Sequence, residues 1–259
     1  MSAALWWAGA VTGAVIVDRS IREGFGEAIA GLADSALVTA LLALVVLPLF
    51  VLAGRGSRRL PAGDAAWLLG SFLGAAVGLR VSGWLPDARF NWDGLITAAV
   101  IVALLMAAYP RATSRDLGVT RPTEPGWVLP TAAMAVAVLA YVLVLDPGGR
   151  SLGGEELLVN LTMPGVTEEL LFRGLLLGVL DLRLGRPWRL WGATVGWGLV
   201  ISTVLFAAVH VLRLDLSITP AGVATIVVGF GLGWIRERTG SIVPAVVTHN
   251  LWNTLGLAL

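Results

Sequence analysis

The chain of 259 residues is 57% hydrophobic and 14% charged, whereas soluble domains are about 45–50% apolar and about 25% charged, so its predicted environment is a membrane. It contains no cysteine, which excludes disulfides, a thiolate nucleophile and cysteine-ligated metal sites, and a net charge of +1 argues against nucleic acid as a partner. All eighteen basic residues are arginine, which also excludes a lysine base or a Schiff base.

Apolar runs of about 20 residues, within a range of roughly 17–25, predict membrane-spanning helices. The first run, Ala3–Val17, is shorter and predicts either an additional span or a helix in the membrane interface. It lacks the basic region and the cleavage site of a signal peptide, so we expect it to be retained. Eight further runs follow in chain order: Ala36–Ala53, Ala65–Leu85, Gly94–Tyr109, Trp127–Leu145, Leu157–Leu180, Trp191–Leu212, Ser217–Ile235 and Ser241–Leu259.

The connections between these runs are short and hold most of the charged and turn-forming residues. None is long enough to fold as a separate soluble domain. We therefore expect an all-α fold, a polytopic transmembrane helical bundle of about eight spans, or nine if Ala3–Val17 also crosses the membrane. Residues 1–150 would supply the N-terminal helices and residues 151–259 the remainder of the same membrane domain, with membrane lipid as its surroundings.

Arginine is unevenly distributed over the connections. If Ala3–Val17 spans, about ten or eleven arginines follow the even-numbered spans and about five follow the others, which predicts a cytoplasmic N-terminus. If Ala3–Val17 lies in the membrane interface instead, the same arginine bias places the N-terminus on the opposite side of the membrane. The side on which the later motifs lie does not change. The alanine-rich, glycine-rich and lysine-free composition suggests a bacterial cell membrane as the location.

Glycines recur one helical turn apart within several runs, and Gly70, Gly74 and Gly78 form the longest such series. Small residues at this spacing allow neighbouring helices to approach closely in lipid. The series predicts helix packing and carries no functional content of its own.

The segment TEELLFRG places Glu168, Glu169 and Arg173 inside the apolar run Leu157–Leu180. An ionised side chain at the centre of a spanning helix costs about 2.5–3.5 kcal/mol, so these groups need partners. Glu169 and Arg173 are four residues apart and can pair on one helical face. Glu168 is rotated by about 100° from Glu169, so we expect it to find a partner elsewhere in the bundle.

The only two histidines of the chain lie in later apolar runs. His210 follows Phe206 by four residues and His249 precedes Asn253 by four, so each pair shares a helical face. The three motifs can converge on one polar cavity. The alternative is three separate interhelical hydrogen bonds that only stiffen the bundle, and three motifs together favour the cavity.

These motifs resemble the CPBP intramembrane proteases, a family that includes the type II CAAX prenyl endopeptidases and the bacteriocin-processing and immunity proteins. The resemblance covers roughly Leu157–Leu259 and includes the surroundings MPGVTEELLFRG and RERTGSIVPAVVTHNLWN. It would make residues 151–259 a CPBP-like catalytic core. The motifs that carry it, in order, are Glu168-Glu169-x-x-x-Arg173, Phe206-x-x-x-His210 and His249-x-x-x-Asn253.

The resemblance implies an intramembrane endopeptidase in which Glu168 and His210 activate a water molecule. It implies further that His249 and Asn253 hold the oxyanion of the tetrahedral intermediate. The substrate would be a hydrophobic or lipid-anchored peptide, or the tail of a membrane-associated protein. The remaining motif residues then take supporting roles: Glu169, Arg173 and Phe206.

A divalent metal such as zinc is one alternative for the chemistry, because Glu168, His210 and His249 could supply three ligands and leave one position open. The same residues could also run a metal-free hydrolysis that depends on the glutamate, and the motifs do not separate the two. No organic cofactor is expected, and the sequence gives no indication of the oligomeric state.

Two non-catalytic alternatives use the same polar cavity. A transporter often shows inverted repeats and broken helices at matching positions in its two halves, and the sequence shows none. An immunity or binding protein would hold a partner peptide without cutting it. Substitution of Glu168 separates these functions from proteolysis, because only hydrolysis requires that carboxylate.

Overall fold

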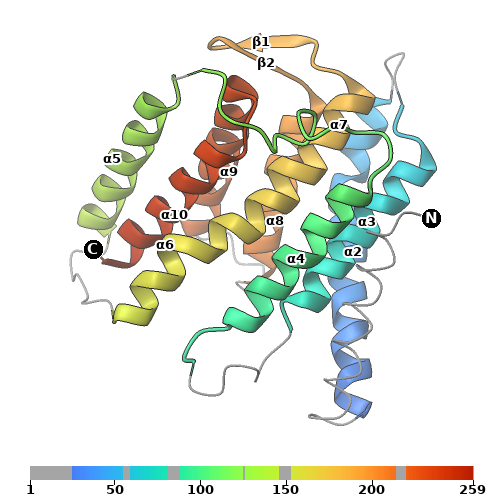
Figure 1. The fold of residues 1–259 in the computed structure, drawn as a ribbon, viewed down its shortest axis with the longest axis horizontal. Coiled ribbons are helices and arrows are strands. Elements are labelled where there is room, and N and C mark those ends of the chain that lie inside the picture. Colours follow the sequence, from blue (N-terminus) through green and yellow to red (C-terminus); the bar gives the residue numbers. More distant parts are fainter. Residues whose placement is uncertain are drawn as a thin grey trace.

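The computed structural model describes residues 25–54, 59–80, 88–124, 126–145, 153–213 and 220–258, and the run Ala3–Val17 lies outside them. Helices packed side by side form most of this part of the chain (Figure 1). The elements are α2 (Phe25–Ala53), α3 (Ala62–Gly78), α4 (Trp92–Ala108), α5 (Val128–Leu145), α6 (Gly154–Glu169), the π-helix η1 (Leu170–Leu176), α7 (Leu177–Leu184), β1 (Trp188–Leu190), β2 (Ala193–Val195), α8 (Trp197–Arg213), α9 (Pro220–Thr239) and α10 (Val243–Ala258).

The predicted all-α class is confirmed, with one short antiparallel hairpin as an addition. The hairpin turn and strand β2 occupy the start of the predicted span Trp191–Leu212, so α8 begins six residues later than expected. The turn residues Trp191 and Gly192 both have positive φ, at 47° and 82°. Two such residues in succession suit a tight hairpin and cannot continue a helix.

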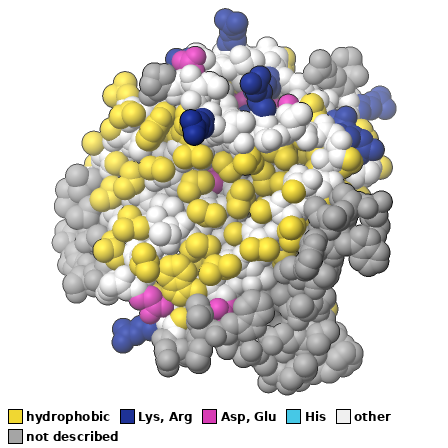
Figure 2. All heavy atoms as spheres, viewed as in Figure 1, with side chains coloured by type: hydrophobic (Ala, Val, Ile, Leu, Met, Phe, Trp, Pro, Cys, Tyr) yellow, Lys and Arg dark blue, Asp and Glu magenta, His cyan; other side chains and the backbone are white. Residues whose placement is uncertain are grey.

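Membrane localisation agrees with the helix compositions. Among the described residues, one segment of 23 residues, Gly31–Ala53, is by itself long and apolar enough to cross a membrane. Shorter apolar helices lie at Ala62–Gly78, Trp92–Ala108 and Trp197–His210. Figure 2 shows hydrophobic side chains across the middle of one face, with arginines mostly above them. The number of spans stays a prediction.

Helix ends differ from the predicted runs where polar residues continue a helix. Helix α2 begins at Phe25 rather than Ala36, and α9 continues past Ile235 to Thr239. Hydropathy finds only the apolar part of a helix, whereas the hydrogen-bonded backbone continues as long as its polar side chains find partners.

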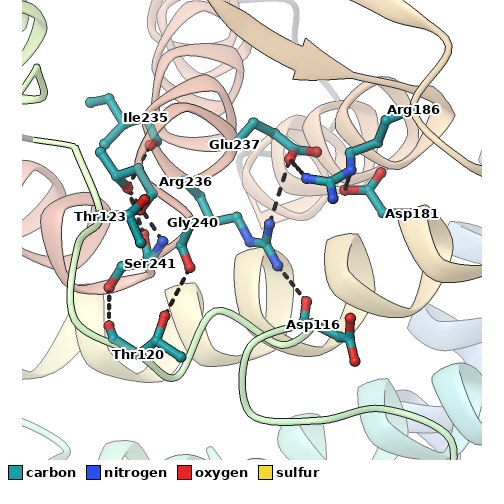
Figure 3. Close-up of polar contacts among 11 residues, drawn as sticks. Asp116, Thr120, Thr123, Asp181, Arg186, Ile235, Arg236, Glu237, Gly240 and Ser241 are labelled. Atoms are coloured by element: carbon teal, nitrogen blue, oxygen red, sulfur yellow. Dashed lines mark hydrogen bonds and ion pairs between the residues drawn. The ribbon is translucent and has the colours of Figure 1, made fainter.

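The polar end of α9 is held by a network at the arginine-rich end of the molecule (Figure 3). The Glu237 carboxylate accepts from Arg186 at 3.0 Å and lies 3.5 Å from Arg236, and Arg236 also donates to the Asp116 carbonyl. Burial alone would lower the pKa of Arg186, but the charge and hydrogen bond of Glu237 outweigh it and raise that pKa. The network fixes the connection between α4 and α5 against α9.

The predicted span Leu157–Leu180 is one continuous but irregular helix made of α6, η1 and α7. Pro164 lies inside α6, and the π-helix begins immediately after Glu169. A π-helix inside an α-helix is rare and occurs often at functional sites. Side chains of η1 are buried in the largest hydrophobic cluster, which includes residues from both halves of the chain.

The predicted glycine packing is present between α3 and α4. A Cβ atom on Gly78 would lie 2.8 Å from the Ala98 backbone, and one on Gly74 would lie 3.0 Å from Ile101. A Cβ atom on Gly70 would meet nothing within 4 Å. Gly78 is therefore the glycine of the series that the contact between these helices requires.

We predict that Gly78→Ala destabilises the protein by about 1–3 kcal/mol, because the methyl group meets a backbone that cannot move aside. Gly70→Ala is the matched control in the same helix and should be neutral or stabilising by up to about 1 kcal/mol. Thermal unfolding in detergent micelles measures both. Equal melting temperatures for the two variants would show that α3 and α4 are not in close contact.

Candidate active site

The predicted pair between Glu169 and Arg173 is present and fully buried, with both side chains 0% exposed. Nη1 of Arg173 donates to Oε1 of Glu169 at 2.9 Å. Its Nη2 donates to the Gly229 carbonyl of α9 at 2.8 Å. The guanidinium therefore connects η1 to a neighbouring helix as well as neutralising the glutamate.

His249 of α10 contacts the same glutamate. Its Nδ1 lies 2.8 Å from Oε1 of Glu169, the oxygen that also accepts from Arg173. A carboxylate can only accept, so Nδ1 carries the proton and Nε2 points away from the pair. The sequence predicted a supporting role for Glu169 but not this contact, because no local spacing relates residues 80 positions apart.

Glu168 faces both histidines, as the convergence of the motifs predicted. Its Oε2 lies 3.7 Å from Nε2 of His210 and 4.0 Å from Nε2 of His249. These separations exceed hydrogen-bond length, and Oε2 has no hydrogen-bond partner among the described residues. The Glu168 side chain is 24% exposed, unlike the fully buried Glu169, although Oε2 itself is buried.

His210 is oriented by its own helix. Nδ1 lies 2.8 Å from the Phe206 carbonyl, one turn earlier in α8. A carbonyl can only accept, so Nδ1 is the protonated nitrogen here too. The neutral ring then presents the lone pair of Nε2 towards Glu168.

Phe206 is the aromatic centre of the site, which gives its predicted supporting role a physical basis. The Arg173 guanidinium lies 4.3 Å from the ring centroid, within the range of a cation–π contact. The rings of His210 and His249 lie 4.5 and 5.7 Å away, centroid to centroid. Phe206 therefore packs against both imidazoles and the buried cation.

Asn253 lies one turn beyond His249 and is partly buried, and its side chain makes no hydrogen bond within the described part of the chain. Asn250 makes the contacts instead. Its Oδ1 accepts from the Gly165 backbone at 2.8 Å and its Nδ2 donates to the Thr162 carbonyl at 3.1 Å. Asn250 thus fixes α10 against α6 near Pro164. Sequence reasoning missed it because it lies outside the repeated four-residue spacing.

A cavity of about 570 Å³ opens beside Glu168. Its walls come from α2, α3, α4, α6, η1 and α8, and most of its lining is apolar. We call it the Glu168 cavity; its polar lining residues are Ser35, Thr39, Arg80, Asn91, Thr167 and Glu168.

A zinc ion held by Glu168, His210 and His249 is the predicted alternative. Among the described residues, no three carboxylate or imidazole side chains are gathered closely enough to hold a metal ion. Zinc ligands lie at about 2.0–2.2 Å from the metal, so Glu168 and the histidines would have to move closer together. The zinc site stays a prediction.

Comparison with known proteins places the three motifs in one family model. Residues 155–255 match the model described as Rce1-like: Type II CAAX prenyl endopeptidase Rce1-like. The matched range begins in α6 and ends in α10, so it contains every motif residue and none of α2 to α5. No curated protein and no solved structure matches the chain.

We predict that Glu169→Gln destabilises the protein by about 3–5 kcal/mol, because the buried Arg173 loses its counter-charge. Glu124→Gln is the matched control, since Glu124 is 54% exposed and lies 3.8 Å from Arg238. That substitution should change stability by less than about 1 kcal/mol. Thermal unfolding in micelles compares the two, and a similar small loss for both would contradict the buried charge cluster.

Proposed function

Because residues 155–255 match the Rce1-like type II CAAX prenyl endopeptidase model, we propose that the chain is an intramembrane endopeptidase whose base is Glu168. The observation that carries this proposal is the position of Oε2 of Glu168, which faces Nε2 of both histidines across gaps of 3.7 and 4.0 Å. Each gap is too long for a direct hydrogen bond and suits a bridging water molecule.

The nucleophile in this proposal is a water molecule held between Glu168 and His210. Its oxygen attacks the carbonyl carbon of the scissile peptide bond while Glu168 takes one of its protons. Nε2 of His210 accepts a hydrogen bond from the second proton and orients the water. Glu168 then gives its proton to the leaving amine as the carbon–nitrogen bond breaks, which yields a carboxylate and an amine. A general base of this kind typically contributes about 10²–10⁴-fold.

His249 and Asn253 stabilise the oxyanion in this proposal. Nε2 of His249 can donate only when the ring carries both protons, and the Glu169 carboxylate supplies the counter-charge for that imidazolium. Two carboxylates, one guanidinium and one imidazolium then leave the cluster without net charge, which reduces the cost of burying it. The Asn253 amide, on the same helix, is the second donor.

The lining of the Glu168 cavity supports a hydrophobic substrate. Val38, Leu42, Phe72 and Leu171 contribute apolar surface to the same cavity that Glu168 lines. A volume of about 570 Å³ lies within the range of roughly 300–1,000 Å³ of ligand pockets. A short segment of a membrane-bound or lipid-anchored peptide fits this chemistry.

We predict that Glu168→Gln abolishes peptide hydrolysis without lowering the melting temperature, because Gln cannot accept the proton. Glu156→Gln, in the other glutamate pair of the chain, is the control and should keep activity. Peptide termini in membranes of host cells that carry each variant are compared by mass spectrometry, which also identifies the substrate. If the peptide termini are the same with Glu168→Gln as with the native protein, and the variant still binds a partner, the immunity or binding function is favoured instead.

We predict that hydrolysis survives removal of divalent metals, because the proposed proton transfers use only side chains and water. The purified protein is dialysed against a strong chelator, assayed, and analysed for bound metal by mass spectrometry. Loss of activity that zinc restores would assign a metal to Glu168, His210 and His249 and would replace the metal-free route.

A further inference from the structure

A second cavity, of about 690 Å³, opens at the arginine-rich end of the molecule and shares no lining residue with the Glu168 cavity. It lies between the connection from α4 to α5, helix α7 and the end of α9, where Figure 3 shows Arg186 and Arg236. The proposed hydrolysis uses no residue of this cavity. We call it the arginine pocket; its basic lining residues are Arg115, Arg121, Arg186 and Arg236.

Two of these four arginines are paired and two are not. Arg186 and Arg236 both lie beside the Glu237 carboxylate, at 3.0 and 3.5 Å. Arg115 and Arg121 are exposed, and neither side chain makes an ion pair or a hydrogen bond within the described part of the chain. The pocket therefore holds two guanidinium charges that no carboxylate of the described residues neutralises.

The two aspartates that line the arginine pocket are engaged elsewhere. Oδ2 of Asp116 accepts from the backbone and the hydroxyl of Thr113, at 2.8 and 2.7 Å. Both carboxyl oxygens of Asp181 are buried, and Oδ2 lies 4.0 Å from Arg186. A Cβ atom on Gly198 of α8 would lie 2.3 Å from Oδ1 of Asp181, so this oxygen faces α8. The groups that an incoming ligand meets are therefore mainly cationic.

The backbone that carries the unpaired arginines is fixed to the end of α9. Oγ1 of Thr120 donates to the Gly240 carbonyl at 3.1 Å, and the Thr123 backbone donates to the Thr239 carbonyl at 3.0 Å (Figure 3). Arg121 lies between these two anchored residues. A backbone that is already ordered lowers the entropy cost of binding a ligand.

The arginine pocket lies at the end of the molecule that carries the marks of a membrane interface. Trp188 and Trp191 of the β1–β2 hairpin, at the same end in Figure 1, are 42% and 75% exposed, and exposed tryptophans are typical of this level. Leu182, which is 37% exposed, adds apolar surface to the pocket itself. The arginine bias predicts that this end faces the cytoplasm, where the lipid surface is negatively charged.

We propose that the arginine pocket binds the headgroup of an anionic phospholipid, with Arg115 and Arg121 donating to its phosphate and Leu182 beside its glycerol. A planar guanidinium matches phosphate oxygens with two parallel hydrogen bonds. Basic pockets between membrane helices on the cytoplasmic side bind lipid headgroups. The volume of about 690 Å³ lies within the range of roughly 300–1,000 Å³ of ligand pockets.

The test measures bound lipid by native mass spectrometry, with phosphatidylglycerol or phosphatidylcholine added to the protein in maltoside micelles. Both lipids carry a phosphate, but only phosphatidylglycerol has a net negative charge. The native protein should bind phosphatidylglycerol about 10–100-fold more tightly, as expected for charge-assisted hydrogen bonds. Arg115→Gln combined with Arg121→Gln should lower the affinity for phosphatidylglycerol to that for phosphatidylcholine.

Arg89→Gln combined with Arg189→Gln is the matched control, because it also removes two positive charges from exposed side chains, and neither residue lines the arginine pocket. It should bind both lipids as the native protein does. Equal affinity of the native protein for the two lipids would overturn the proposed site. An equal loss of phosphatidylglycerol in the two double variants would also overturn it, because surface charge alone would then explain the binding.

Glycerol 3-phosphate distinguishes a lipid from a soluble phosphate ester, because it has a phosphate on glycerol and no acyl chains. It should displace phosphatidylglycerol only at a concentration about 100-fold higher or more, since acyl chains add apolar burial. Displacement at an equal concentration would overturn the lipid as the ligand and assign the pocket to a soluble phosphate ester. None of these measurements uses peptide hydrolysis, so their outcome does not depend on the function proposed above.

Discussion

One carboxylate oxygen, Oε1 of Glu169, organises the site, because it accepts hydrogen bonds from Arg173 at 2.9 Å and from His249 at 2.8 Å. Arg173 continues the chain of contacts to Gly229. Three polar groups that would each be costly in an apolar bundle thus compensate one another. The same bonds fix how η1, α9 and α10 lie together, so the arrangement that makes the buried charges tolerable also orients the His249 ring.

The neighbouring glutamates differ because successive residues of a helix point about 100° apart. Glu169 points into the bundle and is fully buried, whereas Glu168 points into the Glu168 cavity and is 24% exposed. Glu168 lines the cavity, and Glu169 does not. Two identical side chains therefore have different environments. That of Glu169 suits a structural role, and that of Glu168 suits the proposed chemistry. The π-helix begins directly after them, at Leu170.

The sequence predicted what depends on local spacing. The Glu169–Arg173 pair and the convergence of Glu168 with both histidines follow from helix periodicity and from the scarcity of polar partners in an apolar chain. The contact between Glu169 and His249 could not be predicted, because it depends on the rotation of α10 about its axis. The role of Asn250 was missed for a related reason. Its partners are backbone groups near Pro164, and the sequence does not show that these groups can bond to a side chain.

The halves of the chain contribute different things to the site. Residues 155–255 hold every group to which the proposed function gives a part in the reaction, and this is the part that matches the family model. Helices α2 and α3 supply apolar walls of the Glu168 cavity. An apolar wall can change shape and still make its contacts, because apolar contact is non-directional. Groups that transfer a proton need a fixed geometry, because a hydrogen bond weakens steeply with angle. The two halves therefore meet different physical demands. The second half holds the motifs, whose geometry must be fixed, and the first half holds the apolar walls that we expect to select a substrate.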